Sequence, residues 1–148
     1  MAEKRETENY AAIRIRGHIG TSSIMNDTMK MLHIERKNYC TVIPKTITTE
    51  GMLKLLKDYI TYGELEEPTF KILVEKRGEP YMGRLTDSKG DIYYKRFHEI
   101  EGKRLKPFFR LSPPRGGFER KGIKRSFTRG GALGYRGKDI NKLIMRMI

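Results

Sequence analysis

The fold is decided by residues 10–62, which read YAAIRIRGHIGTSSIMNDTMKMLHIERKNYCTVIPKTITTEGMLKLLKDYITY. Within this stretch, residues 10–16, 39–43 and 59–62 are rich in aromatic and β-branched side chains. Apolar residues alternate loosely in the first of these segments, and Pro44 ends the second. This composition predicts three short strands.

The two intervening segments carry apolar residues at steps of three and four, the period of a helix with one buried face. Ser22 or Ser23 is expected to cap the first helix, and Thr48 or Thr49 the second. Side-chain oxygens of these residues accept hydrogen bonds from the free backbone N–H groups of a first helical turn. The residues expected on the buried faces are Met25, Met29 and Leu32 in the first helix, and Met52, Leu55, Leu56 and Tyr59 in the second.

A third helix is predicted after these strands. Glu66, Glu67 and Pro68 suit a first helical turn, because acidic side chains favour the positive end of the helix dipole and proline is tolerated there. Gly78 is a suitable end for this helix. The alternative interpretation is a strand over residues 70–74.

Positive charge is concentrated in the last third of the chain. The chain carries 31 Lys and Arg against 18 Asp and Glu, a net charge of +13, and residues 102–148 hold 14 basic and only 2 acidic side chains. Such an excess repels itself in isolation and is typical of proteins that bind a polyanion, above all nucleic acid. A membrane partner is disfavoured, since no uncharged run approaches the roughly 20 residues of a spanning helix. A single cysteine, Cys40, fits a reducing compartment such as the cytoplasm.

The elements predict an α+β fold, a small three-stranded sheet with two helices on one face, followed by a further helix. The βαβαβ order is that of half a ferredoxin-like fold. Residues 106–137 contain no strong helix or strand signal, whereas apolar residues at helical spacing predict a final helix over residues 139–148. We expect a flexible N-terminus (residues 1–9), a compact RNA-binding body (10–78), a variable connector (79–105) and a basic RNA-binding extension with its C-terminal helix docked on the body (106–148).

Residues 105–137 combine several features of RNA-binding segments. Their Arg and Lys side chains can neutralise phosphates, and Arg can also stack on bases. Their glycines let the backbone approach a phosphate closely. Interleaved aromatic residues can stack on exposed bases or anchor the segment on the body: Phe108, Phe109, Phe118, Phe127 and Tyr135. A disordered basic tail is the alternative, but the aromatic residues and the final helix favour an ordered segment.

Residues 17–20, Gly-His-Ile-Gly, permit two sharper interpretations. A nucleotide phosphate-binding loop needs a lysine before a Ser or Thr, and here Thr21 follows Gly20 directly. The Gly-x-x-Gly loop of a KH domain lies between two helices, whereas this one follows a strand. A tight strand-to-helix turn is therefore favoured.

Nothing in the sequence argues for catalysis or for a metal site. His18, His33 and His98 lack the spacing of zinc ligands. Cys40 within a strand is typical of a small core residue, and no nucleophile-elbow pattern frames a serine. We therefore predict no catalytic residue, no bound metal, no cofactor and no small-molecule substrate.

Motifs spread over most of the chain are shared with one known family. Besides the first strand with its Arg16-Gly17 turn and the final helix, they are DTMKML (27–32), NYC (38–40), GML (51–53), KDYITYGE (57–64), RLSPPRGGF (110–118) and GGALGYRG (130–137). In these motifs the chain resembles the archaeal and eukaryotic form of the ribosomal large-subunit protein thirty family, called protein seven in eukaryotes. The bacterial members resemble only about the first 60 residues. Glu50 departs from the family, which is often basic there.

The resemblance implies a small βαβαβ body that binds rRNA without cofactor or catalysis. The expected partners are large-subunit rRNA and neighbouring ribosomal proteins, in the cytoplasm. A free-standing RNA-binding module of a small ribonucleoprotein is the alternative. The candidate RNA-binding residues are Arg14, Arg16, His18, Lys37, Asn38, Lys45, Arg110, Ser112, Arg115, Gly116, Gly117, Lys121, Lys124, Arg125, Arg129, Tyr135 and Arg136.

Overall fold

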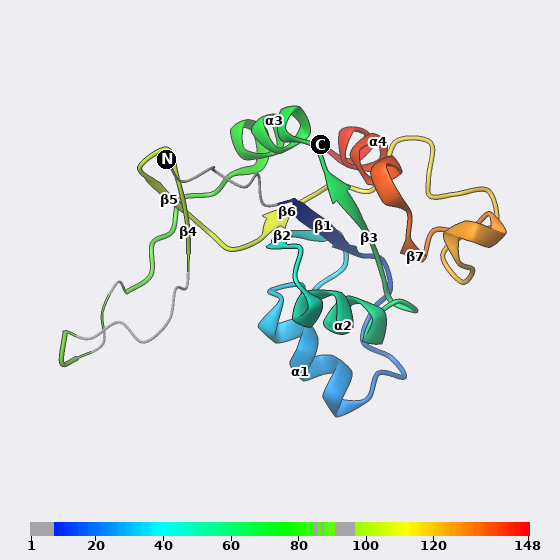
Figure 1. Cartoon of the computed structure of the whole chain (residues 1–148), viewed down its shortest axis with the longest axis horizontal. Coiled ribbons are helices and arrows are strands. Elements are labelled where there is room, and N and C mark those ends of the chain that lie inside the picture. The colour runs from blue at the N-terminus through cyan, green and yellow to red at the C-terminus, as the bar shows by residue number, and fades with distance from the viewer. Residues whose placement is uncertain (1–7, 85, 87, 91–96) are drawn as a thin grey trace.

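Three central strands form the middle of the sheet in this computed structural model, which describes residues 8–84, 86, 88–90 and 97–148. They are β1 (Asn9–Arg14), β2 (Tyr39–Pro44) and β3 (Ile60–Leu65), with β1 between the other two and antiparallel to both. The predicted βαβαβ order is confirmed (Figure 1). Of the predicted flexible N-terminus, residues 1–7 lie outside the described residues.

Helix α1 (Ser23–Met31) begins as predicted, after Ser22, whose Oγ accepts a hydrogen bond from the backbone N of Met25. Helix α2 (Ile47–Leu55) begins earlier than predicted, after Thr46. Thr46 Oγ1 accepts from the backbone N of Thr49, and Thr49 Oγ1 accepts from the backbone N of Thr46. Thr49 is therefore the return partner of a reciprocal cap and not the cap itself.

Helices cover both faces of the sheet (Figure 1). α1 and α2 lie on one face, and α3 (Glu67–Arg77) and α4 (Ile140–Met147) lie on the other. The helical prediction for the segment after residue 66 is confirmed, and the strand alternative for residues 70–74 is wrong.

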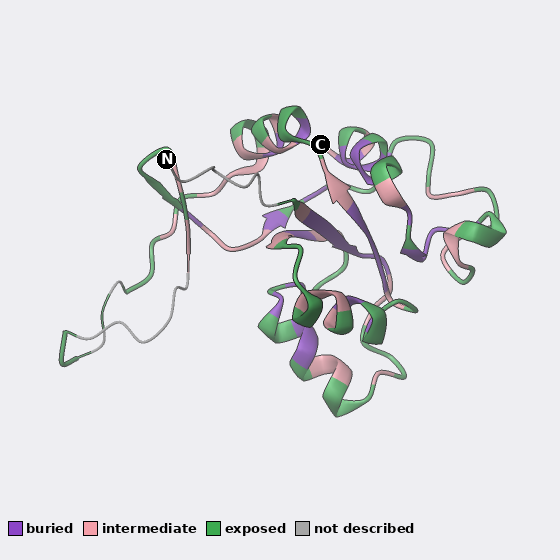
Figure 2. Cartoon of the chain, in the orientation of Figure 1, coloured by how far each residue is buried: buried purple, intermediate pink, exposed green. Residues whose placement is uncertain are grey.

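Two apolar clusters sandwich the sheet, because successive side chains of a strand point to opposite faces. Tyr10 and Ala12 of β1 pack toward α1 and α2, whereas Ala11 and Ile13 pack toward α3 and α4. All four are buried, which makes β1 the most enclosed strand (Figure 2). α4 contributes to the second cluster with Ile140, Leu143, Ile144 and Met147.

The extension adds two strands to the sheet. β6 (Phe109–Arg110) pairs antiparallel with β2, and β7 (Gly134–Tyr135) pairs parallel with β3, which gives the order β6-β2-β1-β3-β7. Two short 3₁₀ turns, η1 (Phe127–Arg129) and η2 (Gly137–Asp139), flank β7. The prediction of no regular element in residues 106–137 is therefore wrong. Strands of two residues leave no periodic pattern in the sequence.

The connector contains a hairpin of β4 (His98–Ile100) and β5 (Lys103–Leu105). Its base is joined to the end of α3, since Lys106 N donates to Glu79 O at 2.8 Å. Residues 85, 87 and 91–96 of this connector lie outside the described part of the chain. Among the described residues, no helix is long and apolar enough to cross a membrane.

Candidate nucleic-acid interface

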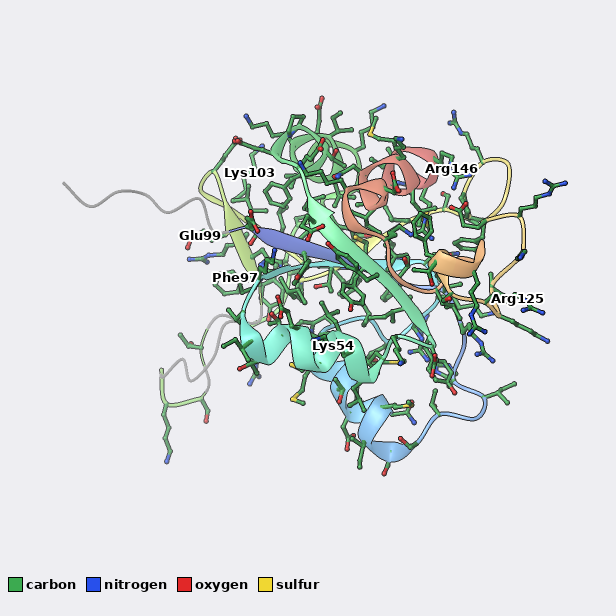
Figure 3. The ribbon with its side chains drawn as sticks, turned by 45° about the vertical axis from the view of Figure 1, so that its right-hand side comes forward. Lys54, Phe97, Glu99, Lys103, Arg125 and Arg146 are labelled. Carbon is green, nitrogen blue, oxygen red and sulfur yellow. The ribbon has the colours of Figure 1, made fainter. Side chains whose placement is uncertain are left out.

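A groove of about 860 Å³ opens between the body and the extension. The body lines it with Lys57 and Asp58, just before β3, and the extension lines it with residues of the segment 120–134, called the basic loop below. Its basic side chains are Lys57, Lys121, Lys124, Arg125 and Arg129. Figure 3 shows Arg125 on this side of the molecule, where nitrogen-tipped side chains point away from the ribbon. The groove is suited to a chain of phosphates.

Backbone hydrogen bonds fix the shape of the basic loop. Ala132 N donates to Gly122 O at 3.1 Å, and Leu133 N donates to Arg125 O at 3.1 Å. Ala132 and Leu133 also pack against Ile15 in a small buried cluster at the end of β1. The cations of the groove are therefore presented by an ordered backbone, which reduces the entropy lost when a ligand binds.

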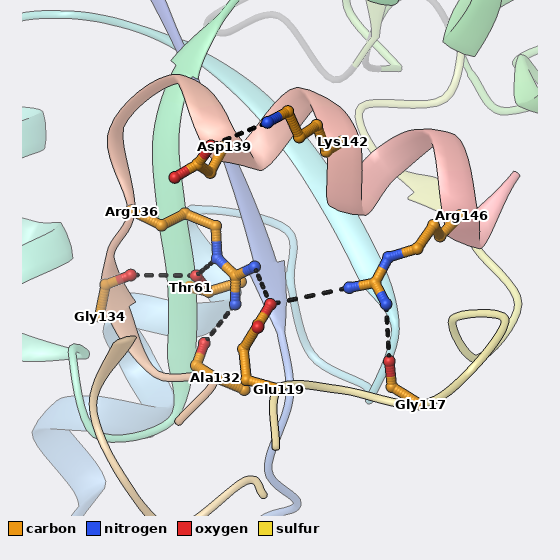
Figure 4. Close-up of polar contacts among 9 residues, drawn as sticks. All are labelled: Thr61, Gly117, Glu119, Ala132, Gly134, Arg136, Asp139, Lys142 and Arg146. Carbon is orange, nitrogen blue, oxygen red and sulfur yellow. Dashed lines mark hydrogen bonds and ion pairs between the residues drawn. The ribbon is translucent and has the colours of Figure 1, made fainter. Parts of the chain in front are cut away.

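Arg136, at the end of β7, fastens the basic loop to the sheet (Figure 4). Its side chain is 1% exposed. Nε donates to Thr61 Oγ1 at 2.7 Å and Nη2 to Ala132 O at 2.8 Å, while the guanidinium lies 4.9 Å from the Phe127 ring centroid. Burial lowers the pKa of Arg136, and the nearby Glu119 carboxylate opposes that shift. An arginine still keeps its charge in such a site.

Arg14 is a second buried arginine: as whole residues, Arg14 is 1% exposed and Arg136 is 4% exposed. Its Nε donates to Arg16 O at 2.8 Å, and its Nη1 donates to Ile34 O at 3.2 Å and Glu35 O at 2.6 Å. The prediction that Arg136 contacts RNA does not fit its position, because its guanidinium is enclosed by protein. Arg14 is buried as well, but it lines a cleft, and its Nη2 has no hydrogen-bond partner among the described residues, so its contact with RNA stays a prediction. Arginines are mostly exposed, so residue type alone pointed to the surface.

Two loops at the end of β1 extend the basic surface beyond the groove. Arg16 donates to the backbone O of Asp58 at 3.4 Å, and its guanidinium lies 5.1 Å from the Tyr59 ring centroid. A Cβ on Gly17 would lie 3.3 Å from Lys37 Cε, so the loops of these two residues are adjacent.

His18 lines a second cleft of about 430 Å³ beside these loops, together with Lys30, Glu35 and Arg36. Asn38 is a structural residue of the neighbouring turn. Its backbone has a positive φ of 64° and its N–H donates to Arg14 O at 2.8 Å. Asparagine tolerates this left-handed conformation better than most residues.

Arg110 and Ser112 lie at the opposite edge of the sheet, on and just after β6. Arg110 Nε donates to Glu79 Oε1 at 2.6 Å, and Ser112 Oγ accepts from Arg77 at 2.8 Å. Both residues are therefore engaged by side chains at the end of α3, at the edge of the sheet opposite to β7 and the groove.

Lys45 and Tyr135 meet at a common partner, Glu64. Lys45 also pairs with Glu8 at 2.9 Å, and this hydrogen-bonded pair raises its pKa. The pKa of Tyr135 is raised to about 12, mainly because its hydroxyl donates a hydrogen bond to Glu64. Both predicted contacts are therefore engaged with carboxylates of the body.

Arg115, Gly116 and Gly117 form an exposed turn on the end of α4. Arg115 N donates to Arg146 O at 3.1 Å, and Gly117 O accepts from Arg146 Nη1 at 3.0 Å. Both glycines have a φ of 79°, and a Cβ on either would meet nothing within 4 Å. Glycine is therefore favoured at both positions by the positive φ and not by a lack of space for a side chain.

We expect Gly116→Val together with Gly117→Val to destabilise this turn by about 1–3 kcal/mol per position, because a β-branched residue is strained at positive φ. The expected result is a lower Tm and weaker binding to nucleic acid, although no charge is lost. Thermal unfolding and an affinity measurement at one salt concentration check it. Wild-type values in both measurements would show that the turn is only a spacer.

Cys40 is fully buried in β2, as the sequence indicated for a core residue. Burial raises the pKa of its thiol to about 12. The thiolate required of a nucleophile is therefore scarce at neutral pH.

Sequence reasoning missed three residues of this region: Lys57, Glu119 and Arg146. Lys57 joins the groove only because the chain turn before β3 lies opposite the basic loop. Glu119 had a visible signal, since it is the one acidic residue between positions 102 and 138. Arg146 lies on the exposed side of α4 and reaches toward Glu119 (Figure 4).

A family model and several individual proteins that are similar to this chain all belong to one family. The sequence model of the family described as ribosomal protein L30p/L7e matches residues 10–60. The large ribosomal subunit protein uL30 of Nanoarchaeum equitans is 45% identical, over 94% of this chain and 98% of its own length. The uL30 proteins of Methanopyrus kandleri, 45% identical over 90% of this chain, and Korarchaeum cryptofilum, 40% identical over 100%, match the whole of their own lengths. The chain therefore belongs to the ribosomal protein L30p/L7e family.

Proposed function

We propose that the groove and its flanking loops bind the sugar–phosphate backbone of large-subunit rRNA. Membership of this family makes the chain a structural protein of the large ribosomal subunit and not an enzyme. The observation that supports the RNA contact is the convergence of five cations, from position 57 and from positions 121–129, on one groove. Positions far apart in sequence meet there on ordered backbone.

The chemistry of the groove suits positioning of RNA more than reading of its sequence. Lys and Arg side chains contact phosphates whatever the base, and each contact releases condensed counterions. Arg16, His18 and Lys37 continue the basic surface beside the groove. Bound in this way, the protein would hold neighbouring rRNA segments in place within ribosomes of the cytoplasm, next to other ribosomal proteins.

Sedimentation of a cell extract at low salt tests directly whether the protein is bound to the large ribosomal subunit. We expect the protein to move with large subunits, and we expect crosslinks to rRNA from residues 121–129. Sedimentation with a small ribonucleoprotein particle would support the free-standing RNA-binding module instead. Crosslinks confined to the β4–β5 hairpin would contradict the proposed interface.

We expect the affinity for rRNA to fall steeply with salt. If about six basic residues meet phosphates, the logarithm of the association constant falls against the logarithm of salt concentration with a slope of roughly −4 to −5. Titrations of the full chain with large-subunit rRNA at several salt concentrations give this slope. A slope near zero would show that positive charge does not determine binding.

A further inference from the structure

Glu119 is an anomaly in the basic extension. It is the one carboxylate between positions 102 and 138, two residues before Lys121, the first basic residue that the extension contributes to the groove. A negative charge at this place repels phosphate, so electrostatics alone predicts that it weakens RNA binding. Its contacts give it a different role.

The Glu119 carboxylate connects two arginines from different elements (Figure 4). Its Oε1 accepts from Arg136 Nη1 at 3.1 Å and lies 3.7 Å from Arg146 Nη2 on α4. The backbone O of Glu119 also accepts from Gly122 N at 2.8 Å, which starts the turn of the basic loop. Glu119 therefore joins the two ends of this loop to α4.

Arg136 extends this hydrogen-bond network from Glu119 to strand β3 of the sheet. Its remaining donors are satisfied by Thr61 Oγ1 on β3 and by Ala132 O at the end of the basic loop. Without Glu119, the buried guanidinium of Arg136 would keep only neutral oxygens as hydrogen-bond partners among these contacts, and the charges acting on it would include the like charge of Arg146 and the weaker attraction of Asp139. A buried charge that loses its hydrogen-bonded counterion is strongly unfavourable.

We propose that Glu119 is a positioning residue for RNA binding: through Arg136 and Arg146 it holds the basic loop in its binding shape before RNA arrives. The proposal rests on the function proposed for the groove. A carboxylate already shared by two guanidinium groups repels phosphate little, and the ordered loop loses less entropy on binding. One negative charge thus strengthens the affinity of a basic surface for a polyanion.

The sign of the effect makes a sharp test. Glu119→Ala raises the net charge, yet we expect it to weaken binding of the full chain to large-subunit rRNA by about fivefold to tenfold at 0.15 M salt. The loss is expected in faster dissociation, since extra positive charge does not slow association. Glu119→Gln, which keeps an oxygen acceptor, should lose less. Glu67→Ala is the matched control, because it removes one exposed carboxylate on α3, and it should bind as tightly as the wild type or slightly more tightly.

Hydrogen exchange of the free variants supplies a readout apart from affinity. We expect faster exchange in residues 120–134 of Glu119→Ala, with protection of β1, β2 and β3 retained. Unchanged or tighter rRNA binding by Glu119→Ala, with the body folded, would overturn the proposal. If Glu119→Ala loses the fold of the body, Glu119→Gln decides: affinity equal to or above that of the wild type overturns the proposal, and a partial loss supports it.

A variant of the groove separates this proposal from the one on which it rests. If replacing Lys121, Lys124 and Arg125 by alanine leaves binding intact, the groove is not the interface and both proposals are overturned. If that variant binds weakly while the Glu119 variants bind like the wild type, only the positioning role is overturned.

Discussion

Replacing Lys121, Lys124 and Arg125 together by alanine should weaken binding to large-subunit rRNA by roughly 50- to 150-fold at 0.15 M salt, with a slope of log affinity against log salt flatter by about 2–3. The three side chains line one groove, so a single RNA segment can contact all of them. The fold should survive, because all three residues are exposed and belong to none of the apolar core clusters. Titrations at several salt concentrations measure both quantities.

The matched control removes the same charge from positions outside the groove. Lys71 and Lys76 are exposed on α3 and Lys103 is exposed on the β4–β5 hairpin, and none of the three lines the groove. Figure 3 shows Lys103 away from Arg125. Alanine at these three positions should leave the affinity for an rRNA fragment that spans the crosslinked site nearly unchanged. An equal loss in both variants would mean that diffuse charge, and not the groove, binds the RNA.

Gly63→Ala should lower the free energy of unfolding by about 1–3 kcal/mol, which lowers the Tm by roughly 3–10 °C. A Cβ on Gly63 would overlap the carbonyl oxygen of Gly137 and lie 3.1 Å from Ile140 Cβ. The overlapped atom belongs to the backbone of η2, so η2 and α4 would have to move away from β3. Thermal unfolding of the purified variant measures the effect.

Gly51→Ala also replaces a glycine by alanine, but it is expected to raise the free energy of unfolding. Gly51 lies within α2 and is exposed, and a Cβ added there would meet nothing within 4 Å. Alanine in an exposed helix interior should stabilise the protein by about 0.5–1 kcal/mol. Equal Tm values for the two variants would contradict the close approach of η2 to β3.

Local pattern was sufficient for the body of the fold. Apolar residues at periods near 2 and 3.6, with Ser22 as a cap, predicted β1, α1, β2, α2 and β3, and the start and stop residues between positions 66 and 78 predicted α3. The prediction that Leu55 lies on the buried face of α2 is wrong, since Leu55 is 42% exposed. β7 was not predictable in this way, because its two residues are a strand only through pairing with Thr61 and Tyr62. Tertiary pairing leaves no trace in a window of a few residues.

The candidate site shows the same division between local and tertiary information. Arg125 and Arg136 have similar neighbours in sequence, in a segment rich in glycine and basic residues. The structure exposes the first at the groove and buries the second against Thr61 and Glu119. The two arginines differ in environment because Thr61 lies opposite β7, beside Arg136. This placement is not visible in the sequence, so both arginines were predicted to contact RNA.

The parallel pair of β3 and β7 determines the order in which the chain can be completed during its own synthesis. Thr61 Oγ1 donates to Gly134 O across 73 positions, and α4 follows only after β7. Residues 9–65 can therefore form β1, β2 and β3 while the outer edge of β3 still has no strand beside it. An open edge strand is a template for unwanted pairing with other chains, and such long-range closure is slow compared with local helix formation. We therefore expect this edge of β3 to stay open during synthesis until residues 134–135 have emerged and paired with it.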